Sequence, residues 1–301
     1  MRRLTLTCVL VTMVAGTSGC LKQIALGSVA NALSASGNGF GRDDDPELIG
    51  DTLPVIIKVM EQLHDSLPKH QELAVALTRA TTSYGVAYIA DDADRVEEKD
   101  VQAARKIRLR ARRMLLRARK YGLAALDISV PGLGAALLGN DRDKRAALLA
   151  KTKKGDVAAL YWTSAAWGAA ISNAKDDMEL VGQLPQVNEL AARALALDES
   201  FEEGAIHELY INLAASQNDR KAAKEHFDRA VQLSHDKKLS PLVTYAEAVC
   251  VDAQDKKEFS RLLDKVLAFD VDSDPDHRLV NILSQRRARW LMSRIADLFA
   301  E

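Results

Sequence analysis

The amino-acid sequence predicts an all-α protein, an α-solenoid of tetratricopeptide-like helical hairpins with a central cavity between them. Three observations predict this class. Only 16 of 301 residues are Gly and 7 are Pro, while 48% are hydrophobic and 28% charged, which favours helices around an ample core. A helical segment recurs every 36 residues. Residues 160–172 read as a helix without a polar face, and such a helix is buried on several sides.

The N-terminus resembles a bacterial lipoprotein signal. Two arginines precede an apolar run at residues 4–14, which is too short to span a bilayer. Residues 17–20 (TSGC) follow, and small residues before a cysteine resemble a lipobox. In such a signal the Cys20 thiol would receive a diacylglyceryl group and become the new N-terminus. Thr17 stands where leucine is usual, and an ordinary secretory signal with a chance cysteine is the alternative.

Three segments follow from this interpretation. We predict a signal peptide at 1–19, a lipidated tether and loop at 20–45, and a single helical domain of tetratricopeptide type at 46–301. Cleavage and lipidation would leave Cys250 as the one free thiol, so no intramolecular disulfide is expected, and its apolar surroundings indicate a small buried side chain. The 41 basic and 42 acidic residues nearly balance, so the composition does not suggest nucleic acid as a partner.

The first helices of the domain begin with recognisable signals. Asp45 is a good N-cap and Pro46 suits the first helical position. The adjacent aspartates 43–45 could also suggest a cation site, but the spaced ligands and glycine of a calcium loop are missing. We expect a kink or a helix start at Pro54 and a second helix over residues 70–90.

Residues 105–120 are strongly basic, yet apolar residues keep helical spacing beneath the charges. We predict a long helix with a solvated face there. A docking face for an acidic partner is the alternative. Nucleic acid is not expected for an exported lipoprotein.

The repeat is clearest in the second half of the chain. Residues 187–198, 223–234 and 259–270 align at intervals of 36 residues, and the middle copy carries small and aromatic residues at the spacing of the second helix of a tetratricopeptide repeat. Residues 116–127 are a plausible fourth copy. Each copy has an apolar face that it cannot bury alone, so the copies must stack. Residues 275–301 read as a helix that caps the stack.

The segment 160–172 contains two of the three tryptophans. Trp162 and Trp167 point about 140° apart on a helix, and their indole N–H groups need partners. The segment is either the central helix of the core or the wall of a cavity for an apolar ligand. Our candidate cavity residues are Tyr161, Trp162, Trp167, His207 and Tyr210.

The sequence contains no recognisable catalytic constellation. His207-Glu208 lacks the second histidine of a metalloprotease, and there is no Gly-rich phosphate loop, nucleophile elbow or Cys/His cluster. We therefore expect no enzyme, no metal and no cofactor. His207 could bind a ligand, but a histidine satisfied between helices is the simpler interpretation.

Several stretches taken together resemble the T component of tetratricopeptide-associated TRAP transporters, a TatT-like family of helical lipoproteins. The matching stretches are Gly19-Cys20, Asp43 to Leu48, Tyr161 to Ser172, Lys175-Asp176, Glu179-Leu180-Val181, Leu184-Pro185, Gly204 to Glu208, Ser240-Pro241 and Gln285 to Leu291. They extend over nearly the whole mature chain.

The resemblance implies a periplasmic α-helical protein that partners the extracytoplasmic solute-binding protein of the transporter. It also implies a cavity or pore for a hydrophobic small molecule. We expect attachment to the membrane through the lipid alone, on the periplasmic side and at the outer rather than the inner membrane. A homo-oligomer is left open. The alternative function is a structural repeat lipoprotein that scaffolds envelope assembly.

Overall fold

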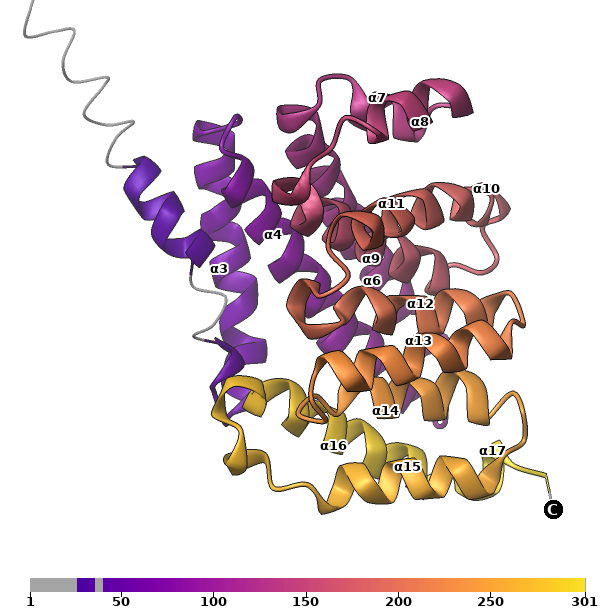
Figure 1. Cartoon of the computed structure of the whole chain (residues 1–301). Coiled ribbons are helices and arrows are strands. Elements are labelled where there is room, and N and C mark those ends of the chain that lie inside the picture. Colours follow the sequence, from indigo (N-terminus) through magenta and orange to yellow (C-terminus); the bar gives the residue numbers. More distant parts are fainter. Residues whose placement is uncertain (1–25, 36–39, 301) are drawn as a thin grey trace, which may run out of the picture.

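The computed structural model describes residues 26–35 and 40–300, and these residues form helices and loops without any strand. The helices stack in layers along the chain (Figure 1). A helix over residues 26–35 precedes α3. The α-helices are α3 (Pro46–Ser66), α4 (Gln71–Tyr84), α5 (Asp91–Glu97), α6 (Val101–Ser129), α7 (Leu133–Leu138), α8 (Arg142–Leu149), α9 (Val157–Ser172), α10 (Met178–Val181), α11 (Leu184–Leu197), α12 (Ala205–Ser216), α13 (Arg220–Leu233), α14 (Ser240–Tyr245), α15 (Lys256–Ala268), α16 (Arg278–Ser293) and α17 (Ile295–Leu298).

Shorter segments link these helices. Two are π-helical, η1 (Gly85–Ala90) and η4 (Ala246–Cys250). Four are 3₁₀ turns: η2 (Lys154–Asp156), η3 (Phe201–Glu203), η5 (Val271–Ser273) and η6 (Pro275–His277). The all-α fold class predicted from composition and repeat spacing is confirmed.

Aspartate side chains start many of the helices. Asp45 Oδ1 accepts the backbone N–H of Leu48 at 2.9 Å, with Pro46 at the first helical position, as the sequence predicted. Asp219 and Asp255 cap α13 and α15 in the same way. These two caps stand 36 residues apart, so the repeat extends to the residues that start each helix. A side-chain cap satisfies an N–H that has no partner within the helix.

The three clear repeat copies occupy α11, α13 and α15 in equivalent register. Positions 36 residues apart in the copies are buried together, namely Val187, Ala223 and Phe259; Ala191, Phe227 and Leu263; and Ala194, Ala230 and Val266. Helix α11 packs on α9, α13 on α12 and α15 on α14. The fourth copy, residues 116–127, lies in the second half of α6, which packs extensively on α4 and α9.

Some boundaries differ from those predicted. Of the kink or helix start expected at Pro54, the helix start is wrong, because Pro54 lies inside α3. The helix continues past it although the proline has no N–H to donate to Gly50. The segment 70–90 divides into α4 and the π-helical turn η1, and α5 continues it. Residues 275–301 are a 3₁₀ turn, α16 and the short α17 rather than one helix, although Glu301 itself lies outside the described residues.

Three apolar clusters follow one another along the chain. The first joins the helix at 26–35 to α3 and α4, the second joins α4, α6, α7, α9 and α11 to one side of α12, and the third joins the other side of α12 to α13 through α17. Cys250 belongs to the third cluster and is buried, as expected, and burial raises the pKa of its thiol to about 12. Helix α12 therefore connects the two larger cores.

The last layer returns to the first. Helix α16 packs beside α3 at the lower left of Figure 1, and several ion pairs join the two layers there. We call these contacts between residues 42–98 and residues 276–294 the closure. They include Arg42–Asp276 at 2.6 Å, Arg286–Glu47 at 2.8 Å and Arg294–Glu98 at 2.9 Å. The helices thus form a closed ring rather than an open stack.

Candidate ligand-binding opening

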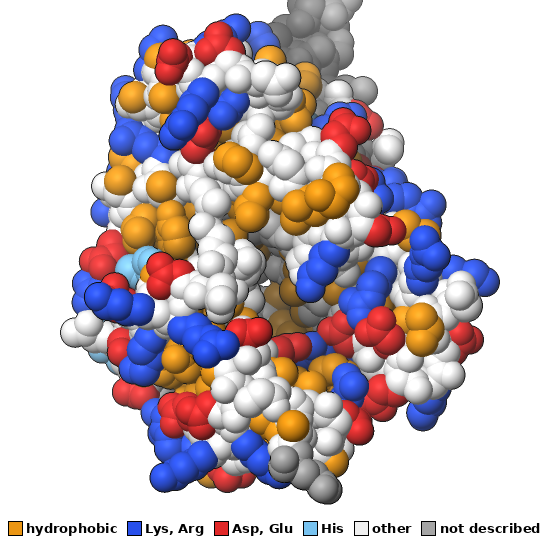
Figure 2. All heavy atoms as spheres, turned by 90° about the vertical axis from the view of Figure 1, so that its right-hand side faces the viewer, with side chains coloured by type: hydrophobic (Ala, Val, Ile, Leu, Met, Phe, Trp, Pro, Cys, Tyr) orange, Lys and Arg blue, Asp and Glu red, His pale blue; other side chains and the backbone are white. Residues whose placement is uncertain are grey.

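The ring surrounds an opening. Figure 2 shows a face of the molecule that is hollowed near its centre, with hydrophobic side chains inside and acidic and basic side chains beside and below it. Helices α4 and α9 pack closely on α6, and α14 packs on α12 and α16. Among the described residues these two groups do not pack extensively on each other. The opening therefore lies between the two halves of the ring.

The predicted central helix is α9, and its two sides have different surroundings. Its Trp167 side is core: the residue is 0% exposed, its Nε1–H donates to Gln183 Oε1 at 3.1 Å, and the Arg119 guanidinium lies 4.6 Å from the ring centroid. A small residue allows α6 to approach closely, because a Cβ on Gly122 would stand 2.1 Å from the Thr163 hydroxyl oxygen. Trp167 is fully enclosed by protein, so no ligand reaches it in this structure, and we do not retain it as a cavity residue.

The other side of α9 carries a cluster of aromatic side chains. The Tyr161 ring lies edge-on to Trp162 at 4.9 Å between centroids and 5.4 Å from Phe201. Trp162 Nε1–H points at Glu202 Oε1 at 3.4 Å. Both Tyr161 and Trp162 are half-buried. This aromatic cluster, Tyr161, Trp162 and Phe201, offers a broad apolar surface with polar groups at its edge, which is the composition of small-molecule sites.

The Tyr161 hydroxyl is the polar group at the edge of the cluster. Burial raises the Tyr161 pKa well above its usual value, and the charges of Glu202 and Glu208 add to the shift. Yet no described residue forms a hydrogen bond with the hydroxyl, and its oxygen is not sealed from solvent. The hydroxyl is therefore free to form a hydrogen bond with a ligand bound against the cluster.

A strained turn holds Glu202 beside the aromatic cluster. Three successive residues, Glu202, Glu203 and Gly204, have φ values of 42°, 55° and 89°. Left-handed backbone costs a side-chain-bearing residue about 1 kcal/mol or more. Gly204 avoids that cost, and a Cβ there would also meet the Ala230 Cα at 3.1 Å. Strain of this kind concentrates at functional sites.

His207 and Tyr210 belong to a separate group between α12 and α13. The two Nδ1 atoms of His207 and His226 lie 2.8 Å apart, and His207 Nε2 lies 3.2 Å from Glu199 Oε1. Tyr210 stacks on His226 at 4.6 Å between centroids. Burial lowers the pKa of both histidines, and for His207 the neighbouring His226 adds to the effect. No ring contact or hydrogen bond connects this group with the aromatic cluster.

Sequence reasoning missed three residues. His226 occupies the repeat position of the buried Leu190 and Leu262, and this departure from the apolar register could have identified it. Phe201 and Glu202 gave no signal, since nothing local shows that this turn packs against the aromatic side chains of α9.

The described residues contain neither a candidate membrane span nor a candidate metal site. No helix among them is both long and apolar enough to cross a membrane. Within the same residues no three His, Cys, Asp or Glu side chains gather as metal ligands would. Cys20 lies outside the described residues, so its lipidation remains a prediction.

The fold and the opening define a class: an all-α tetratricopeptide-like repeat protein with an internal space. The family model described as TRAP transporter T-component matches residues 42–299. The chain therefore belongs to the T-component family of TRAP transporters, as its sequence motifs indicated. This family consists of accessory components of a transport system and is not a family of enzymes.

One relative extends the comparison over almost the full length. A protein of Treponema pallidum (strain Nichols), described as uncharacterized, is 29% identical to this chain over 307 aligned positions. The alignment covers 94% of each protein.

Proposed function

We propose that this protein is a lipid-anchored periplasmic accessory component that docks the solute-binding protein of a TRAP-type transporter and holds an apolar ligand in its central opening. Membership of the T-component family supports the transport role. The observation that carries the ligand proposal is the half-buried aromatic cluster of α9 and η3, whose Tyr161 hydroxyl has no hydrogen-bond partner among the described residues.

The proposed anchor is Cys20, which would hold the protein on the periplasmic side of the outer membrane. In that position the opening would receive solute from the receptor without exposing it to water. Burying apolar ligand surface contributes about 25 cal/mol per Å², so a ligand of moderate size would be retained by contact with the ring walls alone.

Ligand binding can be measured with N-phenyl-1-naphthylamine, whose fluorescence rises in apolar surroundings. We use the full chain carrying Cys20→Ser, which prevents lipidation. Trp162→Ala is expected to weaken dye binding about tenfold, because it removes one face of the cluster. The matched control is Trp290→Ala, which changes the tryptophan of the closure and leaves the cluster intact. Equal effects of the two substitutions would contradict the proposed site.

Receptor docking is measured by sedimentation of the same Cys20→Ser chain with the solute-binding protein encoded by the source organism. A complex at tens of micromolar or below is expected, with and without the dye. Absence of a complex under both conditions would favour the scaffolding function instead.

A further inference from the structure

The basic side chains of α6 fall into two groups, and the first group holds the fold together. Its members pair with carboxylates on neighbouring elements. They are Arg108 with Asp94 and Glu97, Arg112 with Asp177, and Arg117 with Glu61. Their carboxylate partners come from α3, from α5 and from the residue that caps α10. The positive charge of these arginines is therefore compensated within the protein.

The second group lies on the outward face of α6. The side chains of Lys106, Arg113 and Lys120 are exposed, and none of them has a hydrogen bond or an ion pair with any described residue. They follow one another at intervals of seven residues, which is close to two helical turns, so they form one line with steps of about 10 Å. We call these three residues the basic row.

The surroundings of the basic row add to its positive charge. Arg110 donates to the neutral hydroxyl of Tyr84 at 3.1 Å, which leaves its charge uncompensated. Arg105 has Asp176 at 4.0 Å, but the two side chains are 70% and 79% exposed, and such a surface pair contributes little. Helix α6 contains no Asp or Glu before Asp127. This face is thus strongly positive on a chain whose net charge is −1.

The basic row also exposes an apolar side chain and stands on a rigid base. Leu109 lies three residues after Lys106 and four before Arg113, so it shares their face, and it is 46% exposed. The opposite face of α6 is buried against α4 and α9. The charges therefore keep fixed positions along the helix, and a partner with a matching arrangement of carboxylates would be recognised by geometry as well as by charge.

We propose that the outward face of α6 docks an acidic surface of the solute-binding protein, with carboxylates against the basic row and an apolar side chain against Leu109. The inference rests on the receptor docking proposed above and assigns the surface of this chain that performs it. Complementary charge suits such a partner, because it speeds association and fixes the register of the two surfaces. An anionic bilayer would instead favour a face with several apolar side chains to insert.

The test removes the charges of the basic row from the Cys20→Ser full chain. The triple variant carries Lys106→Gln, Arg113→Gln and Lys120→Gln, since glutamine keeps the helix propensity. Its affinity for the solute-binding protein, measured with a biosensor at low salt, should be about tenfold lower or less, chiefly through slower association. Salt screens exposed charges, so the difference from the unaltered chain should shrink at high salt.

A matched control removes the same charge elsewhere. Lys151→Gln, Lys256→Gln and Lys257→Gln change three side chains that are likewise exposed and without partners among the described residues. This control triple should bind the receptor as the unaltered chain does. Leu109→Ala should weaken binding about threefold at both salt concentrations, because it removes apolar contact and no charge. Circular dichroism melting shows whether each variant has folded.

The outcomes separate the docking surface from the docking itself. If the receptor binds the unaltered chain and the basic-row variant equally, or if the control triple weakens binding as much, the assignment to α6 is overturned and receptor docking stands. If the receptor binds neither chain at either salt concentration, the docking proposal falls and this inference falls with it. Sedimentation of the chain alone and with phosphatidylglycerol vesicles completes the series. A basic-row variant that loses self-association or vesicle binding while keeping the receptor would also overturn the inference.

Discussion

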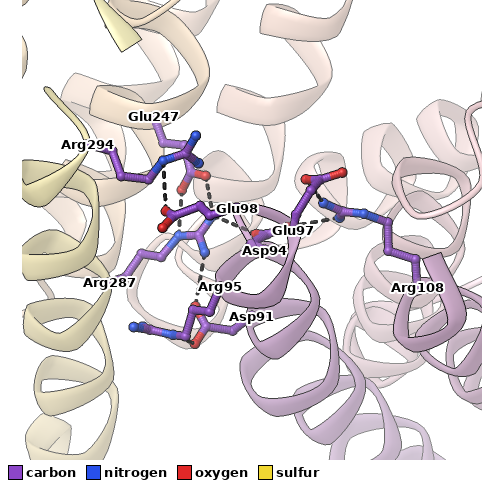
Figure 3. A network of polar contacts seen from close by, with 9 residues as sticks. All are labelled: Asp91, Asp94, Arg95, Glu97, Glu98, Arg108, Glu247, Arg287 and Arg294. Carbon is purple, nitrogen blue, oxygen red and sulfur yellow. Dashed lines mark hydrogen bonds and ion pairs between the residues drawn. The ribbon is translucent and has the colours of Figure 1, made fainter. Parts of the chain in front are cut away.

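The layer that joins α6 to α9 and the closure that joins α16 to α3 and α5 hold the ring together by opposite means. Between α6 and α9 the contact is apolar and close, with Trp167 fully buried and Gly122 admitting Thr163. In the closure Arg287 lies among Asp91, Asp94 and Glu247 (Figure 3), at 3.0 Å from Asp91 and 2.7 Å from Asp94.

The closure has little apolar surface to bury. Its one large ring, Trp290, lies beneath the guanidiniums of Arg287, Arg294 and Arg95, whose central carbons are 4.2, 5.1 and 5.9 Å from the ring centroid. Hydrogen bonding to Glu247 and three nearby carboxylates raise the Arg287 pKa, although burial alone would lower it. Desolvation offsets much of the attraction in such networks. The difference teaches that the two contacts depend on different forces, and we expect the closure to separate more easily than the layer of α6 and α9.

The largest expected loss of stability comes from removing the buried Trp167 side chain between α6 and α9. Trp167→Ala should lower the free energy of unfolding by about 3–5 kcal/mol, because it creates a cavity and removes the ring on which Arg119 stacks. Denaturant titration followed by circular dichroism measures the change. Trp290→Ala, the same substitution in the closure, should cost less than half as much. Comparable losses would mean that the two contacts do not differ as described.

An intermediate effect is expected from Arg287→Met. It leaves Asp91, Asp94 and Glu247 close together without their shared cation, which should cost about 1–3 kcal/mol for a side chain that is 17% exposed. The loss should be local: amide hydrogen exchange should accelerate in α5 and α16 and remain unchanged in α6 and α9. Arg289→Met on the exposed face of α16 is the control and should change exchange in neither pair. Faster exchange throughout the chain would refute a separable closure.

The smallest effect is a pH dependence within the α12–α13 layer. The folded state lowers the pKa of His207 and His226 below 6.5, so it binds fewer protons than the unfolded chain, and stability should fall as the pH drops below 6.5. His64, whose pKa burial also lowers, adds to this trend. Glu199, with a pKa of about 2, stays ionised there.

The histidine contribution is isolated with His226→Phe, which retains a ring against Tyr210 but removes one titrating group. Melting temperatures between pH 7.5 and 5.5 should fall less steeply in this variant than in the unaltered chain. The matched substitution His64→Phe should reduce the slope independently. An unchanged slope in the His226→Phe protein would show that the pair is already protonated or not in contact in solution.

Much of this architecture could be predicted because apolar residues and helix caps recur at regular intervals along the sequence. The repeat of 36 residues placed α11, α13 and α15, and the same period recurs in the caps Asp219 and Asp255. The helix at 160–172 was identified by its lack of a polar face, and it does lie at the centre of the largest core. Family motifs spread over the chain led to the T component, which the family model confirms.

Within the candidate site, the residues that the sequence grouped together lie in different parts of the structure. Sequence reasoning grouped Tyr161, Trp162, Trp167, His207 and Tyr210, because aromatic and histidine side chains suit a ligand. The structure places them in three surroundings: Trp167 in the core, Tyr161 and Trp162 beside the opening, and His207 with Tyr210 between α12 and α13. Rotation about a helix axis separates Trp162 from Trp167, but only the neighbouring helices decide which side is sealed.

The sequence by itself determined which segments are helical, where the repeated helices begin and which of their faces are buried, because propensity, capping and apolar spacing act over a few residues. Only the tertiary structure decided that the stack closes into a ring. Arg287 meets Asp94 across 193 positions, and Trp162 meets Glu202 across 40. Such pairings depend on the accumulated angles of every intervening layer, and no local pattern in the chain records that sum.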